Sequence, residues 1–87
     1  MRKSIEREVR EMVAANVKAG KVNNRNLFEP SKMAKCMWGE HSTINNRDFI
    51  VCNVVEFIRE CHPYADLTGV GGVINDEIEK RVFIERY

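Results

Sequence analysis

The sequence predicts an α+β fold that is mainly α, with three helices followed by a C-terminal β-hairpin, in one domain over residues 1–87. Apolar residues recur at helical spacing in three separate segments, and the last quarter combines glycines with β-branched residues. Eighty-seven residues are too few for two independent cores. With 44% apolar and 31% charged residues, the chain has an ordinary globular composition, so disorder is not expected.

The first helix is predicted from about Lys3 to Ala19. Its outer side carries opposite charges four residues apart, such as Glu6 and Arg10, which stabilise a helix. A chain of this size has a small core, so we expect the apolar side of this helix to pair also with a second copy and form a homodimer. The apolar side consists of Ile5, Val9, Met12, Val13 and Val17, and the residues expected to pair with the second copy are Ile5, Val9, Met12 and Val17.

A polar, asparagine-rich loop follows, and it leads to two further helices. The second is short, begins near Pro30 and runs to about Trp38, because proline is tolerated in a first turn. The third begins at Ile44 or Asn46 and ends at Cys61. Its broad apolar side predicts that it is the most buried helix of the chain.

The C-terminal segment favours a β-hairpin that turns around residues 75–77. Residues 67–74 are rich in glycine and β-branched residues, and residues 78–87 alternate in part between apolar and charged side chains. The competing interpretation is a terminal helix capped by Asn75, in which Ile78 and Val82 lie four residues apart. The apolar run of residues 82–84 favours the strand.

Charge is distributed unevenly along a chain whose formal net charge is +1. Residues 1–47 carry ten Lys or Arg against five Glu, which gives +5, whereas residues 48–87 carry four against eight acidic residues, which gives −4. The basic excess lies between Lys18 and Arg47, together with five asparagines. Cations neutralise phosphates and amides bind base edges, so this segment is typical of a nucleic-acid-binding surface. The alternative is a solvated face with no ligand.

The order of these elements resembles that of a winged helix-turn-helix protein over residues 27–87. Residues 31–39, followed by residues 42–47, are similar to the helix, turn and recognition-helix entry of that superfamily. The resemblance implies that Ala34 allows close helix packing, that Met33 and Met37 point inward, and that Val73 to Tyr87 form the wing.

The resemblance also implies a surface for duplex DNA. The start of the third helix would lie in the major groove, lysines of the preceding helix and loop would hold phosphates, and two basic residues would lie on the wing. The expected DNA-binding residues are Lys21, Arg25, Lys32, Lys35, Ser42, Thr43, Asn45, Asn46, Arg47, Lys80 and Arg81.

No catalytic residue, metal site or cofactor is expected, and so no enzyme. The spacing of the cysteines and histidines does not match the paired ligands of structural zinc sites, and we expect Cys52 and Cys61 to be buried as small apolar side chains. The segment 1–12 is charged where a signal peptide would be apolar, and no apolar run is long enough to cross a membrane. These features predict a cytoplasmic protein with no membrane partner.

Two functions remain open from the sequence. The first is a small DNA-binding regulator of transcription or accessory protein that acts on duplex DNA as a dimer. The second is a protein-interaction module, an adaptor or inhibitor without nucleic-acid binding, that uses its acidic C-terminal half. The single tryptophan, Trp38, is either a core residue packed on the first helix or an exposed contact for a partner.

Overall fold

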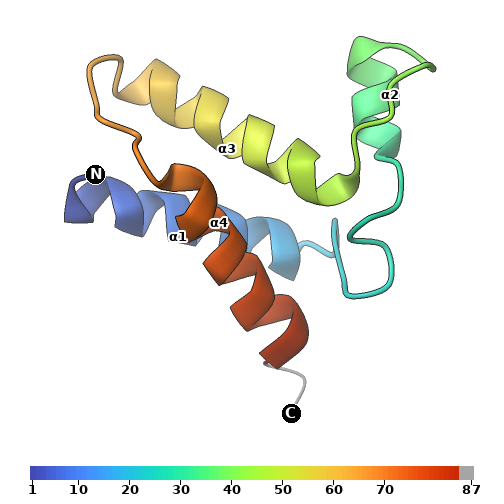
Figure 1. The fold of residues 1–87 in the computed structure, drawn as a ribbon, viewed down its shortest axis with the longest axis horizontal. Helices are drawn as coiled ribbons and strands as arrows, with labels where there is room; N and C mark the ends of the chain where they lie inside the picture. The colour runs from blue at the N-terminus through green and yellow to red at the C-terminus, as the bar shows by residue number, and fades with distance from the viewer. Residues whose placement is uncertain (85–87) are drawn as a thin grey trace.

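The computed structural model, which describes residues 1–84, is helical throughout its regular structure. Its elements are α1 (Lys3–Lys18), α2 (Lys32–Trp38), α3 (Asn46–Cys61) and α4 (Val70–Glu79), and α4 continues into a π-helical turn, η1 (Lys80–Ile84). Figure 1 shows α4 crossing α1, with α3 alongside and α2 standing apart beyond the N-terminal end of α3. The described part of the chain is flat, with extents of 36 × 34 × 19 Å.

The core lies where α1, α3 and α4 meet. Each helix contributes aliphatic side chains spaced three or four residues apart, so that one side of each helix faces the other two. The loop between α1 and α2 adds two residues, and α2 adds none to this cluster. The buried residues are Ile5, Val9, Val13, Val22, Leu27, Ile50, Val54, Ile58, Ile74, Ile78 and Val82.

The three helices predicted in the first two thirds of the chain are confirmed. Ser31 caps α2, because its Oγ accepts the Ala34 N–H at 3.1 Å. Asn45 caps α3 in the same way, with its Oδ1 accepting the Asp48 N–H at 2.8 Å. Pro30 lies one residue before the cap of α2, in an isolated β-bridge with Asn45, and not in the first helical turn.

The predicted C-terminal β-hairpin is wrong, and with it the α+β class and the wing. Residues 70–79 form α4, and no strand is present among residues 1–84. The competing helix capped by Asn75 is also misplaced, because α4 begins five residues earlier, after Gly69. Residues 85–87 of the predicted second strand lie outside the described residues.

Helical spacing explains why this segment is a helix. Val70, Ile74, Ile78 and Val82 follow one another at intervals of four and point toward α1 and α3, and the last three are buried. In a strand these four residues would share one face with Asp76 and Lys80, so apolar and charged side chains would be less well separated. The apolar run of residues 82–84 belongs to the π-helical turn that continues α4.

Other expectations about burial also change. Cys52 is half-buried, and Cys61 and Cys36 are exposed, so none of the three cysteines belongs to the core. On α1, Ile5 and Val9 are buried in the core, and Met12 and Val17 are partly buried against it. The pairing of this helix with a second copy stays a prediction.

Candidate interaction surface

The start of α3, where the sequence places the DNA-reading residues, is tied to the loop before α2. The Asn46 N–H donates to the Glu29 carbonyl at 3.0 Å, and the Arg47 N–H donates to the Leu27 carbonyl at 3.0 Å. The Asn46 side chain donates to the Asn26 carbonyl at 2.7 Å. Asn45 accepts the Asp48 N–H, so the first N–H groups of α3 already have partners.

Arg47 turns toward α4. Its Nε donates to Oδ1 of Asn75 at 3.0 Å, and its Nη1 lies 3.6 Å from a carboxylate oxygen of Asp48. The guanidinium is half-buried and joins the start of α3 to the middle of α4. Asn45, Asn46 and Arg47 are therefore half-buried and take part in hydrogen bonds that hold elements of the fold together.

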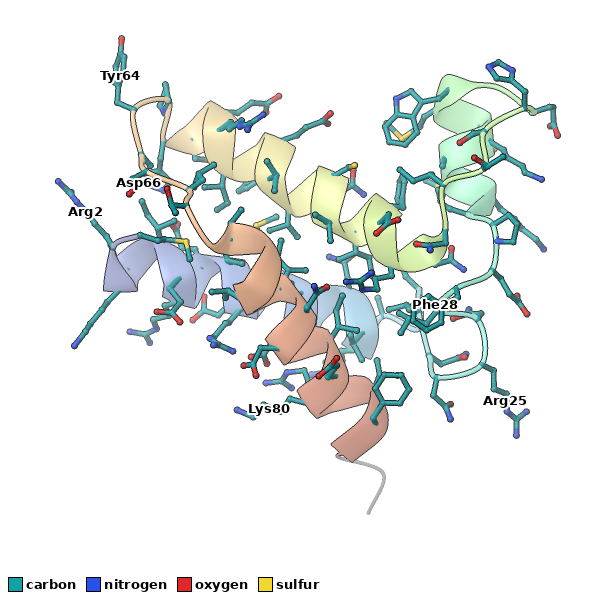
Figure 2. All side chains as sticks on the ribbon, in the orientation of Figure 1. Arg2, Arg25, Phe28, Tyr64, Asp66 and Lys80 are labelled. Atoms are coloured by element: carbon teal, nitrogen blue, oxygen red, sulfur yellow. The ribbon has the colours of Figure 1, made fainter. Side chains whose placement is uncertain are left out.

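The remaining predicted DNA-binding residues are spread over the molecule. Lys21, Arg25, Lys32, Thr43 and Lys80 are exposed, whereas Lys35, Ser42 and Arg81 are half-buried. Figure 2 shows Arg25 on the loop before α2 and Lys80 near the end of α4, pointing to different sides of the molecule. Arg81 bonds Glu77 at 2.6 Å.

The most exposed apolar helix is α2. Met33, Met37 and Trp38 keep 56%, 54% and 42% of their surface exposed, while Ala34 is fully buried against the rest of the chain. We call Met33, Met37 and Trp38 the α2 surface. Met33 and Met37 lie four residues apart and form one ridge of the helix. This ridge was expected to point inward.

One intramolecular contact anchors the end of α2. The Trp38 ring meets the Phe49 ring of α3 edge to face, with centroids 5.7 Å apart and planes at 62°. Trp38 therefore packs on α3, not on α1, and remains partly open to solvent. Phe28, on the loop that leads to α2, is 68% exposed.

The helical spacing of α2 does not by itself show which side is exposed. Ala34 and Trp38 are four residues apart, as are Met33 and Met37, and the two pairs differ by about 100° around the helix, with Met37 also three residues from Ala34. A helix of seven residues that packs on one neighbour cannot bury both pairs equally. The burial of Ala34 and the exposure of the methionines in the structure identify the side that packs.

Two acidic residues of α4, Asp76 and Glu77, are paired with Arg10 of α1. Arg10 donates to Asp76 at 2.7 Å and to the buried Glu77 at 2.9 Å, and a third carboxylate, Glu6, lies 3.4 Å away. Burial would raise the pKa of Glu77, but the hydrogen bonds from Arg81 and Arg10 outweigh it and hold that pKa below its ordinary value. Asp76 and Glu77 therefore stabilise the packing of α4 on α1.

A hollow of about 690 Å³ lies at the other end of the molecule, between the start of α1 and the loop after α3. His62 Nε2 lies 2.8 Å from a carboxylate oxygen of Glu8, which links the end of α3 to α1.

Among the described residues, no three His, Cys, Asp or Glu side chains gather in a way that would hold a metal ion. None of the helices that the structure describes combines the length and apolar character needed to cross a membrane.

Comparison with family models, with curated proteins and with solved structures found no match to this chain.

Proposed function

We propose that this chain is a small protein-interaction module and that the α2 surface is its binding site. The observation that carries the proposal is the exposure of Met33, Met37 and Trp38 on a helix that contributes nothing to the core cluster. Methionine and tryptophan are enriched at protein interfaces, and unbranched methionine side chains adapt to a partner's shape. Covering them removes apolar surface from water, which favours association.

This proposal moves the binding site away from the acidic C-terminal half. Asp76 and Glu77 are occupied by Arg10 and Arg81 within the chain, so they do not explain the choice of a partner. Lys32 and Lys35 lie on a different side of α2 from Met33 and Met37, and neither lysine has a carboxylate partner among the described residues.

Substitution of the methionine ridge tests the proposal. Wild-type protein on a column is mixed with a nuclease-treated lysate of the source cells, in parallel with Met33→Gln/Met37→Gln and Tyr64→Ser. Glutamine keeps the length and helix propensity of methionine, and Tyr64 is fully exposed on the loop after α3, far from α2 (Figure 2). We expect a stoichiometric protein that the wild type and Tyr64→Ser retain and the double variant loses. Equal retention by all three proteins contradicts the proposal.

A second function, nucleic-acid binding, is favoured by one specific observation. Lys18, Lys21 and Arg25 are exposed at the end of α1 and on the following loop, and none has a carboxylate partner within the described residues. Phe28 on the same loop offers an exposed ring for base stacking. Such a surface would bind through phosphates, without the start of α3.

Salt-titrated binding of duplex and single-stranded DNA tests this second function. We expect Lys21→Gln/Arg25→Gln to weaken binding and to lower the slope of log K against log salt by about one for each phosphate contact removed. Lys3→Gln, an exposed cation on α1, is the control. Absence of binding at low salt, or an unchanged slope, excludes this function. Asn46 and Arg47 are unsuitable for the test because both support the fold.

A further inference from the structure

Three sulfur-bearing side chains lie on the outer side of α2. The chain has three cysteines and four methionines, and one of these cysteines and two of these methionines belong to this seven-residue helix. They are Met33, Cys36 and Met37, and all three are exposed. Figure 1 shows α2 standing apart from α1 and α4, so neither of these helices covers them. We call these three residues the α2 sulfur cluster.

Helix geometry places the three side chains next to one another. Cys36 is three residues from Met33 and Met37 is four, and residues at both spacings are neighbours on a helix, with Cβ atoms about 5–6 Å apart. Successive residues turn by about 100°, so Cys36 and Met37 lie on either side of Met33 within an arc of about 100°. Buried Ala34 and the packed Trp38 both lie beyond Met37, outside this arc. No packing residue of α2 therefore separates the three sulfur atoms.

The types of donor in this cluster favour one metal ion. Mg²⁺ and Ca²⁺ take oxygen ligands, and a structural zinc site takes four ligands from cysteine and histidine. Among the described residues no three His, Cys, Asp or Glu side chains gather around one point, so a site at Cys36 needs methionine as a further ligand. Thiolate and thioether sulfur together are the soft donors that select Cu(I). The expectation of no metal site considered only the spacing of cysteines and histidines.

Both methionines are free to turn their sulfur atoms toward Cys36. A methionine side chain is unbranched and has three rotatable bonds, and neither Met33 nor Met37 belongs to the core cluster. The helix backbone is fixed, because Ser31 caps its first turn and the Trp38 ring packs edge to face on α3. A fixed backbone with adaptable side chains allows three sulfur atoms to meet on one ion without a change of fold.

We propose that the α2 sulfur cluster is a binding site for one Cu(I) ion. Cys36 Sγ binds as a thiolate and releases its proton to solvent, and the Sδ atoms of Met33 and Met37 supply the two other ligands. The negative charge of the thiolate balances the single positive charge of the ion, and neither copper nor sulfur changes its oxidation state. This inference does not rest on the proposed function, because the ion binds to the free chain. The two shared methionines mean that the ion and a protein partner compete for this side of α2.

Titration with Cu(I) tests the inference. Reduced protein without added thiols is titrated anaerobically in competition with a colorimetric Cu(I) chelator, which gives the stoichiometry and the dissociation constant. The wild type is compared with Cys36→Ser and with Met33→Leu/Met37→Leu. We expect the wild type to bind one ion per chain. Each variant should raise the dissociation constant at least about tenfold, because losing a ligand costs no less than losing a residue that orients one.

Cys61→Ser and Met12→Leu are the matched controls. Cys61 is an exposed cysteine at the end of α3, and Met12 is a methionine of α1. Both variants should leave the dissociation constant unchanged. X-ray absorption at the copper edge counts the sulfur neighbours of the ion, and we expect the wild type to show the three sulfur atoms of the cluster and Met33→Leu/Met37→Leu to show only that of Cys36. Circular dichroism verifies that every variant retains its helices.

Four results overturn the inference. A wild type that binds no Cu(I) excludes the site, and an unchanged dissociation constant in Met33→Leu/Met37→Leu shows that a thiol alone holds the ion. An equal loss of affinity in Cys61→Ser places the ion elsewhere, and one ion shared by two chains divides the ligands between copies.

The same variants separate this inference from the proposed function. Cys36→Ser keeps both methionines, and leucine keeps the apolar character of the α2 surface, so both variants should retain a protein partner on the column. If the wild type binds no Cu(I) and a protein is lost only from Met33→Gln/Met37→Gln, the copper site is excluded and the proposed function stands. If Cu(I) binds as expected and that column shows no difference, the proposed function fails and the copper site stands.

Discussion

At the residue scale, Glu77 is the group on which the C-terminal part of the chain depends most. It is 2% exposed, yet it carries a charge, because Arg10 and Arg81 donate to its two oxygens at 2.9 and 2.6 Å. A buried carboxylate without such donors would be strongly destabilising. Arg10 and Glu77, which are 67 residues apart in the sequence, form an ion pair that links α1 to α4.

The lowered pKa of Glu77 predicts a specific acid dependence of stability. A group whose pKa is lower in the folded state stabilises the fold above its unfolded pKa, about 4.3 for Glu, and this contribution is lost as the pH falls toward the folded pKa. We expect urea unfolding to show this loss for the wild type below about pH 4.3. Glu77→Gln should be less stable by about 2 kcal/mol near neutral pH and should lack this part of the pH dependence. If the wild type and Glu77→Gln lose stability equally as the pH falls, the pKa of Glu77 is not lowered in the folded state.

Arg47 provides the second prediction at this scale. Because its Nε donates to Asn75 at 3.0 Å, we expect Arg47→Ala and Asn75→Ala each to lower the free energy of unfolding by about 1 kcal/mol. The double variant should cost less than the sum of the two, with a coupling of about 0.5 kcal/mol or more. Additive losses in this double-mutant cycle would mean that Arg47 supports the fold in another way.

At the element scale, α4 is the least expected helix, because its first turn contains Gly71 and Gly72. Apart from adjacent residues and the backbone of α4 itself, no atom of the described chain lies within 4 Å of the position that a Cβ would take at either glycine. Glycine in a helix is less favourable than alanine by about 1 kcal/mol. The helix persists because Ile74 and Ile78 are fully buried, which outweighs this cost.

The positions of two glycines predict that their substitution by alanine changes the free energy of unfolding in opposite directions. Gly72→Ala should raise the free energy of unfolding by about 1 kcal/mol, since it lies in a helix with open space around it. Gly20→Ala should lower it by about 1 kcal/mol, because Gly20 has a φ of 78° at the end of α1, which L side chains adopt only with strain. Thermal or urea unfolding measures both. A destabilising Gly72→Ala would contradict a helix at this position.

At the scale of the whole molecule, the folding core and the proposed binding surface lie in different parts of the chain. The core is formed by α1, α3 and α4, whereas α2 is attached to the N-terminal end of α3 and exposes most of its apolar side chains. A protein of this size has little surplus stability, so exposed apolar side chains on a peripheral helix indicate a binding role more than a packing role.

Truncation of matched aliphatic side chains tests this separation. Ile74→Ala removes a side chain with no exposed surface and should lower the free energy of unfolding by about 3 kcal/mol. Met37→Ala removes a side chain that is 54% exposed and should change it by less than about 0.5 kcal/mol. Comparable losses in urea unfolding would mean that the α2 surface belongs to the folding core.

Parts of this organisation were predictable because the signal is local. Long stretches with a helical repeat of apolar residues define α1 and α3, and Ser31, Gly39 and Asn45 mark where helices end or begin. The exposure of Lys21, Arg25 and Lys32 also followed from their charge alone. The side of α2 that faces solvent could not be predicted from the sequence, because both methionines and the tryptophan are apolar and local spacing does not show which neighbour covers them.

The amino-acid sequence by itself determined the three helices of its first two thirds, the polar loop between the first two, and the division into a basic and an acidic half. Only the tertiary structure decided that the last quarter is helical, that Arg47, Asn45 and Asn46 hold elements together, and that the α2 surface stays open. The physical reason is that these outcomes depend on partners distant in the sequence. Packing against α1 selects the helix at Ile74 and Ile78, and the geometry of α3 and α4 decides which side chains remain in water.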